Sequence, residues 1–145
     1  MTRADGFITL VEGLLGYKQF NLVKRACEEA ISTRKFHNDP RTWKLLAVAN
    51  GSLGNHELAK SALREALVLR YDENTLANLV TACFATDATN EALSLVEDHW
   101  EFMDERAKSD ISRSLNEAIR IGKIDGRDIP NNVLNEYIEF TCENF

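Results

Sequence analysis

The chain has 145 residues, of which 44% are hydrophobic and 28% charged, and its formal net charge is -6. This composition is typical of a folded globular domain and excludes a disordered chain. Because proteins bind the nucleic-acid backbone mainly through Lys and Arg, the acidic excess argues against DNA or RNA as a partner. No apolar run reaches the length of a transmembrane helix, so we expect no membrane association.

The cysteines and the N-terminal segment indicate a cytoplasmic protein. Cys27, Cys83 and Cys142 lie far apart and form no C-x-x-C motif. An odd number of cysteines fits a reducing compartment better than a disulfide framework. The N-terminal segment carries two acids among its apolar residues and lacks a small-residue cleavage site, so it does not resemble a signal peptide.

The first two predicted helices cover residues 6–17 and 20–33. Their apolar positions recur at helical spacing. These positions are Phe7, Leu10, Val11 and Leu14 in the first helix and Phe20, Val23, Cys27, Ala30 and Ile31 in the second. Asp5 is placed to cap the first helix with its side-chain oxygen. We expect the turn between the helices to depend on Gly16.

Residues 34–40 form a predicted linker, because Asn-Asp-Pro at its end is a turn signal. Two helices follow within residues 41–69 and are separated at Gly54, which suits the left-handed backbone that ends many helices. Their apolar positions are Trp43, Leu46, Ala47 and Val48 in the first and Leu58, Ala59, Ala62, Leu63, Ala66 and Leu67 in the second. This stretch predicts a helical hairpin.

A third pair of helices is predicted over residues 74–86 and from about residue 89 to about residue 106. Asp87 occupies the turn position, and Asp tolerates turns well. His99 and Trp100 stand where the central hairpin has smaller residues. We therefore expect the third hairpin to pack differently at its end.

The last two predicted helices cover residues 110–122 and 131 to about 143, joined by a loop over residues 123–130. Asp110 is a candidate N-cap and Gly122 a candidate helix stop. A stack of hairpins leaves a hydrophobic end that needs a cover. The pair therefore either caps the preceding hairpins or forms a degenerate fourth copy.

The first three hairpins repeat one pattern. Shifts of 36 and 33 residues place the apolar positions of the first and third hairpins on those of the central one. The central hairpin resembles a tetratricopeptide repeat (TPR) in its opening Trp43, its Leu46-Ala47 pair, Gly54 and the A-x-x-x-L-x-x-A-L run that begins at Ala59. The period of that family is about 34 residues. The resemblance covers about residues 5–104.

The resemblance implies an all-α fold of stacked antiparallel helical hairpins, a TPR-like α-solenoid of about eight helices in a single domain over residues 1–145. Its repeats would cover approximately residues 5–37, 40–72 and 74–104, followed by the capping or degenerate fourth pair at 108–143.

In this family the first helix of each hairpin lines a concave groove that binds a peptide or a partner segment. By alignment, the groove would receive Thr9, Glu12, Arg41, Lys44, Val48, Asn78, Thr81, Phe84 and Arg113, with Ser112 and Asn116 beside Arg113. Lys44 and Asn78 stand where some members hold a peptide's C-terminal carboxylate. Val48 replaces the Asn of that clamp, so we predict no true clamp.

Catalytic and metal-binding patterns are missing from the sequence. His37, His56 and His99 are isolated, and neither a His-x-x-x-His spacing nor a Gly-rich phosphate loop occurs. We therefore expect no enzyme, no cofactor, no metal and no small-molecule substrate. The expected function is protein–protein interaction, in an adaptor or a chaperone, with a peptide or partner segment in the groove.

The charge distribution supports a second interpretation. Residues 73–145 carry six Lys and Arg against fifteen Asp and Glu, a net charge of -9. The densest acidic run consists of Glu97, Asp98, Glu101, Asp104 and Glu105. It is either a solvated helix face or the docking face of an acidic inhibitor or immunity-type protein for a basic partner. A third reading is a piece of a longer repeat protein; the oligomeric state stays open.

Overall fold

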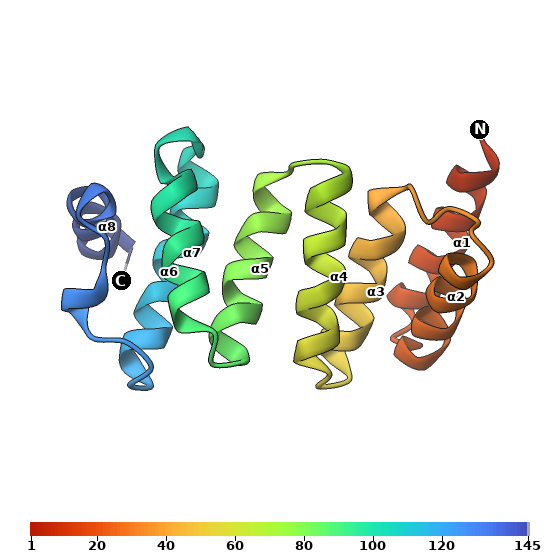
Figure 1. Ribbon diagram of the computed structural model, residues 1–145, viewed down its shortest axis with the longest axis horizontal. Helices are drawn as coiled ribbons and strands as arrows, with labels where there is room; N and C mark the ends of the chain where they lie inside the picture. Colours follow the sequence, from red (N-terminus) through yellow and green to blue (C-terminus); the bar gives the residue numbers. More distant parts are fainter. Residues whose placement is uncertain (145) are drawn as a thin grey trace. The chain divides into compact units, whose positions relative to one another are not determined.

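The computed structural model describes residues 1–144, and every regular element among them is helical (Figure 1). The predicted all-α class is confirmed. The α-helices are α1 (Arg3–Gly16), α2 (Phe20–Ser32), α3 (Pro40–Ser52), α4 (His56–Leu69), α5 (Glu73–Ala85), α6 (Thr89–His99), α7 (Glu105–Arg120) and α8 (Asn131–Asn144). Two short 3-10 turns, η1 (Trp100–Phe102) and η2 (Gly126–Asp128), complete the set. The chain divides into two compact units, the first Met1–Thr75 and the second from Leu76 onward.

The first unit contains two antiparallel hairpins, α1–α2 and α3–α4 (Figure 1). The N-cap of α1 is Thr2, so the prediction that Asp5 fills this position is wrong. Asp5 is the third helical residue, and its carboxylate accepts from the Thr2 backbone N–H while the Thr2 hydroxyl accepts from the Asp5 N–H, both at 3.0 Å. This reciprocal capping box starts the helix earlier than expected because it satisfies two free N–H groups.

Both hairpin turns of this unit use one residue with a left-handed backbone. Gly54 has φ +82°, as predicted, and Lys18 has φ +59° at the equivalent place. The following N–H donates back into the helix, from Gln19 to Leu14 O at 3.0 Å and from Asn55 to Asn50 O at 2.7 Å. Gly16 is helical, so the first turn depends on Lys18 and not on Gly16.

The core of the first unit follows the predicted faces except at Leu10, Val48 and Leu58, of which Val48 is 45% and Leu58 50% exposed. The most deeply buried apolar residues are Ile8, Val11, Val23, Cys27, Ala49, Ala62 and Ala66. Leu10 was predicted to be buried but is 74% exposed, and Ile8 takes its place in the core. Leu46, its counterpart in α3, is 7% exposed because α3 packs against α2.

The linker between the hairpins is ordered by specific contacts. Asp39 caps α3, accepting from the Arg41 N–H at 2.9 Å, and Pro40, expected at the end of the linker, is the first residue of the helix. Phe36 stacks on Phe7 with ring centres 4.9 Å apart. The Trp43 indole N–H donates to the His37 carbonyl at 2.8 Å. These contacts hold the linker against both hairpins of the unit.

The second unit contains α6, α7, α8 and nearly all of α5. The turns after α5 and α7 repeat the geometry of the first unit. Asp87 has φ +60° and Gly122 φ +80°. The next N–H groups, those of Ala88 and Lys123, each donate at 2.8 Å to a carbonyl one turn back in the helix. The left-handed residues of the chain's four odd-numbered helices therefore stand at 18, 54, 87 and 122.

The boundary between α6 and α7 differs from the prediction. A single helix was expected to continue to about residue 106, but α6 ends at His99 and η1 follows. Asp104 then caps α7, its carboxylate accepting from the Ala107 N–H at 2.9 Å. Asp110, the predicted N-cap, lies inside this helix. The predicted start of this helix is therefore five residues too late, because the capping bond of Asp104 starts it at Glu105.

Trp100 anchors the core of the second unit and is completely buried. The Lys108 ammonium lies 5.4 Å from its ring centre and pairs with Glu136 of α8 at 2.9 Å. Other buried residues of this core are Val80, Cys83, Ala92, Val96, Ile111, Leu115 and Val133. Trp100, the large residue at the end of the third hairpin, thus packs against the fourth pair of helices, α7 and α8. These two helices are joined by a longer loop that contains η2.

Candidate functional site

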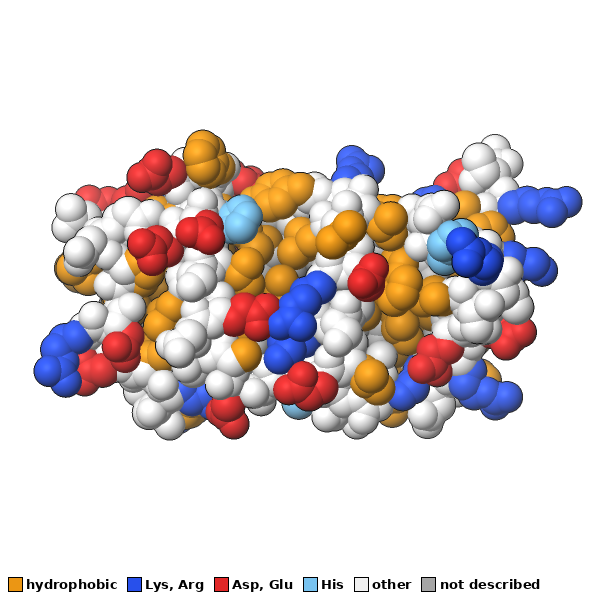
Figure 2. Space-filling view, viewed as in Figure 1, with side chains coloured by type: hydrophobic (Ala, Val, Ile, Leu, Met, Phe, Trp, Pro, Cys, Tyr) orange, Lys and Arg blue, Asp and Glu red, His pale blue; other side chains and the backbone are white. Residues whose placement is uncertain are grey.

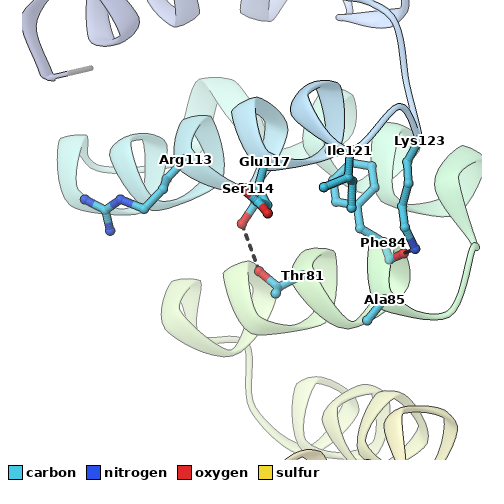
Figure 3. Close-up of a pocket in the computed structure, with 9 residues that line it drawn as sticks. Thr81, Phe84, Ala85, Arg113, Ser114, Glu117, Ile121 and Lys123 are labelled. Carbon is cyan, nitrogen blue, oxygen red and sulfur yellow. Dashed lines mark hydrogen bonds between the residues drawn. The ribbon is translucent and has the colours of Figure 1, made fainter.

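A groove of about 300 Å³ lies between α5 and α7 in the second unit (Figure 3). Its apolar surface comes from Phe84 and Ala85 of α5 and from Ala118 and Ile121 at the end of α7. Phe84 is 6% exposed and Ile121 49% exposed, so Phe84 lies deep and Ile121 lies at the opening. The remaining lining residues are Thr81, Arg113, Ser114, Glu117 and Lys123.

Two polar contacts cross from α5 toward the end of α7 and bound the apolar part of the groove. On one side the Thr81 and Ser114 hydroxyls lie 2.9 Å apart, within hydrogen-bond distance (Figure 3). On the other side the Lys123 ammonium donates to the Phe84 carbonyl and pairs with Asp87 at 2.8 Å. The apolar surface between them is therefore a short slot rather than a channel.

The charges around the groove are paired with one another. Arg113 lies 3.6 Å from Asp110, and the Arg120 guanidinium donates to the Glu117 carboxylate at 2.9 Å. Hydrogen bonding to Arg120 holds the pKa of Glu117 below its ordinary value. With the pair of Lys123 and Asp87, the rim carries three cations and three carboxylates. The groove itself is therefore close to electroneutral.

Three of the predicted groove residues, Thr81, Phe84 and Arg113, line this site together. Sequence reasoning missed Ala85, Ser114, Glu117, Ala118, Ile121 and Lys123. The signal that could have found them is Gly122, which lies 35 residues after Asp87 at the equivalent turn position. That spacing sets the register of α7 against α5.

Two neighbours of Arg113 that were expected in the groove are not available there. Ser112 is fully buried. Asn116 is half-buried and accepts a hydrogen bond from the Tyr137 hydroxyl of α8. Their side chains face the core and α8 because, at about 100° per residue, they lie on the opposite side of α7 from the lining residues Ser114 and Glu117.

The predicted groove residues of the first unit do not line the α5–α7 groove. Thr9, Glu12 and Val48 are exposed, and Asn78 of α5 is exposed outside the lining. Arg41 pairs with Asp5 at 3.0 Å and with Asp39 at 2.7 Å.

Lys44 of the first unit forms an ion pair at the base of α5. Its ammonium lies 2.8 Å from the Asp72 carboxylate, which also accepts from the Thr75 hydroxyl at 2.8 Å. The bond from Lys44 is the main cause that lowers the pKa of Asp72 to about 2. Lys44 therefore already holds a carboxylate from its own chain.

The five carboxylates of the acidic run, Glu97, Asp98, Glu101, Asp104 and Glu105, are all exposed. Phe102 lies among them in sequence and is 79% exposed. On the face drawn in Figure 2, acidic side chains outnumber basic ones over the second unit. We call these five carboxylates and Phe102 the acidic face. Asp104 is also the N-cap of α7, so one carboxylate of the acidic face has a structural role.

The cysteines and other potential reactive groups lie apart. None of the three cysteines of residues 1–144 is in a disulfide; Cys27 and Cys83 are buried and Cys142 is exposed. Burial raises the pKa of the Cys27 thiol to about 12. Among residues 1–144, no three His, Cys, Asp or Glu side chains gather as a metal ion requires. Within the same described chain, no helix has the length and apolar character needed to cross a membrane.

Comparison with known proteins gave no relative for this chain: no family model matches its sequence, and no curated protein and no solved structure matches it.

Proposed function

We propose that the protein is a non-catalytic protein-binding module of TPR-like architecture. It acts as an adaptor or a chaperone and holds a segment of a partner protein in the α5–α7 groove. It uses no cofactor and works in the cytoplasm, a location favoured by cysteines that are in no disulfide, as Cys27, Cys83 and Cys142 are.

The repeated turn geometry supports the TPR-like part of the proposal. The left-handed residues at 18, 54, 87 and 122 follow each other at 36, 33 and 35 residues. These intervals lie around the period of about 34 residues that characterises this repeat family. They also favour a degenerate fourth repeat over an unrelated cap for α7 and α8.

The groove between α5 and α7 is the observation that supports partner binding. It is an apolar concavity between the first helices of two successive hairpins, where the resemblance implies partner binding. Three residues predicted for that role contribute to it. Partner sites of this kind combine an apolar centre with a polar rim, as the lining described above does.

The test is affinity capture from a lysate with three forms of the full chain: wild type, Ile121→Glu and Val68→Glu. Ile121 is 49% exposed at the groove and Val68 is 81% exposed on α4, outside its lining, so both changes place one carboxylate on a partly exposed apolar site. We expect the captured partner to be lost with Ile121→Glu and retained with Val68→Glu. Retention with both variants would refute the groove as the binding site.

The exposed Phe102 favours a second candidate function. A large aromatic side chain that is 79% exposed among five carboxylates is typical of a contact residue. In this alternative the protein is an acidic inhibitor or immunity-type protein that binds a basic partner through the acidic face. Association would then slow by tenfold or more between low and high salt, because exposed charges are screened. A salt-independent rate would refute it.

A further inference from the structure

We infer that the α5–α7 groove accepts a single bulky apolar side chain, inserted end-on from a segment of the partner that is rich in Lys and Arg. This inference rests on the proposed function and adds the chemistry of the partner. It follows from the polar contacts that close the slot at both ends, from its walls and from the distribution of charge outside it.

Two polar contacts cross the slot and close its apolar surface at both ends. The Thr81 and Ser114 hydroxyls meet at one end, and the Lys123 ammonium donates to the Phe84 carbonyl at the other. A peptide backbone would have to displace the Thr81–Ser114 contact or the Lys123 bond, whereas a side chain can enter between them.

The walls suit an apolar side chain. Phe84 forms the deep wall and Ile121 the opening, with Ala85 and Ala118 leaving space between the helices. A volume of about 300 Å³ is at the lower end of small-molecule sites. Leu, Met or Phe side chains fit such a space and gain from leaving water.

The rim does not favour an acidic partner. Each rim cation already lies within 3.6 Å of a carboxylate of this chain: Arg113 with Asp110, Arg120 with Glu117, and Lys123 with Asp87. A carboxylate of the partner would therefore compete with an existing pair. The rim therefore contributes no net charge. The sign of the electrostatic potential around the groove is set by the other charged residues of the unit.

That potential is strongly negative. From residue 76 to the end of the chain there are six Lys and Arg and fourteen Asp and Glu, a net charge of -8. Since the three rim pairs cancel, all of this net charge lies outside the rim. Surface charge of one sign raises the rate of encounter with an oppositely charged segment. Basic residues beside the anchoring side chain are therefore the complementary choice.

The experiment is a phage-displayed random-peptide selection on the immobilised full chain, in parallel with Ile121→Asn and Val68→Asn. Val68→Asn is the matched neutral control outside the groove. Enriched peptides are then synthesised and their affinity measured at low and high salt. We expect one central Leu, Met or Phe with flanking Lys or Arg, at least tenfold weaker binding to Ile121→Asn, and unchanged binding to Val68→Asn.

The outcomes separate this inference from the proposed function. Peptides that need Ile121 but carry acidic or neutral flanks, or no bulky apolar residue, overturn the inference and leave the groove as a binding site. Peptides that bind the Ile121→Asn variant as well as the wild type overturn both. The absence of any enriched peptide also overturns both, provided that circular dichroism shows the immobilised protein to be folded.

Discussion

Lys18 and Asp87 hold backbone angles that glycine adopts most readily. Both have φ near +60°, where the Cβ of an L-residue lies too close to the neighbouring carbonyl. The two remaining residues of this set, Gly54 and Gly122, avoid that cost. Asp87 also pairs with Lys123 beside the groove at 2.8 Å. Backbone hydrogen bonds close the turn at Lys18, including the one from the Lys18 N–H to the Leu15 carbonyl at 2.9 Å. The fold thus stores a small backbone strain at both Lys18 and Asp87.

Replacement of Lys18 by Gly should stabilise the protein. Gly removes the steric cost of the left-handed backbone, but it also gives the unfolded chain more conformational freedom, which opposes folding. The net gain in the free energy of unfolding is about 0.5–1 kcal/mol. Urea denaturation measures this value. Lys18→Ala removes the same side chain but keeps the strain, so it should give no such gain. Equal stability of the Gly and Ala variants would contradict this explanation.

The ion pair between Lys44 and Asp72 makes a second prediction at this scale. The pKa of Asp72, about 2 in the folded chain, lies below the ordinary value of 3.8. The pair therefore stabilises the fold above about pH 4, and this contribution is lost as the pH falls toward 2. Lys44→Met should flatten the pH dependence of stability in that window.

The loss in this variant at neutral pH should be about 1 kcal/mol at most, because water reaches a third of each side chain and screens the pair. Thermal unfolding between pH 2 and pH 7 measures both effects. Arg25→Met, which removes an exposed cation from α2, is the control and should leave the acid profile unchanged. An unchanged acid profile in Lys44→Met would argue against the pair.

At the scale of elements, side-chain caps mark where α1, α3 and α7 begin. Thr2, Asp39 and Asp104 each accept a hydrogen bond from the backbone of the helix that follows. Asp104 matters most for the site, because α7 supplies Ser114, Glu117 and Ile121 to the groove. The register of the groove therefore depends on a residue of the acidic face.

Asp104→Ala and Glu105→Ala remove the same charge from adjacent positions of the acidic face, but only the first removes the observed cap of α7. We expect Asp104→Ala to lower the free energy of unfolding by about 1 kcal/mol and Glu105→Ala to change it by less than about 0.5 kcal/mol. Chemical denaturation followed by Trp fluorescence measures both. Equal losses would mean that charge, and not the capping bond, governs this position.

How much the sequence could predict also depends on the element. The period of apolar residues was enough for the all-α class and for the hairpin turns at Gly54 and Asp87. It placed the boundary between α6 and α7 too late in the chain, because a helical apolar pattern continues across η1 and the Asp104 cap that restarts the helix gives no apolar signal. Leu10 was misassigned because burial depends on a neighbouring helix, which periodicity alone does not supply.

The candidate site was predicted in part for the same reason. Thr81, Phe84 and Arg113 came from alignment with the family, and they converge in one groove. Ile121 and Lys123 were missed because a groove between two helices requires the register of one helix against the other, which the sequence does not give. The pairing of Lys44 with Asp72 was also beyond sequence reasoning, since its partners are 28 residues apart.

At the scale of the whole molecule, the three cysteines differ in burial and in the unit to which they belong. Cys27 is completely buried in the first unit, Cys83 is completely buried in the second, and Cys142 is exposed on α8. Burial raises the pKa of Cys27 to about 12, so little thiolate forms there at neutral pH. The native protein should therefore expose one reactive thiol.

A maleimide reagent at neutral pH should modify Cys142 within minutes and leave Cys27 and Cys83 unmodified until the protein unfolds. Peptide mass spectrometry identifies the labelled positions, and Cys142→Ser, which should show no native labelling, is the control. Labelling during a denaturant series then gives the unfolding midpoint of each unit from its own buried thiol. Rapid modification of Cys27 in the native protein would contradict its position in the core.

The recurring left-handed turns also bear on how fast the chain reaches its native state. Each hairpin closed by such a turn brings together segments that are close in sequence, so its ends meet at little entropic cost. Proteins dominated by local contacts of this kind fold in microseconds to milliseconds. The exception is the longer connection from Gly122 to α8, which passes through η2. Docking of α8 onto α7 is therefore the step that we expect to complete folding.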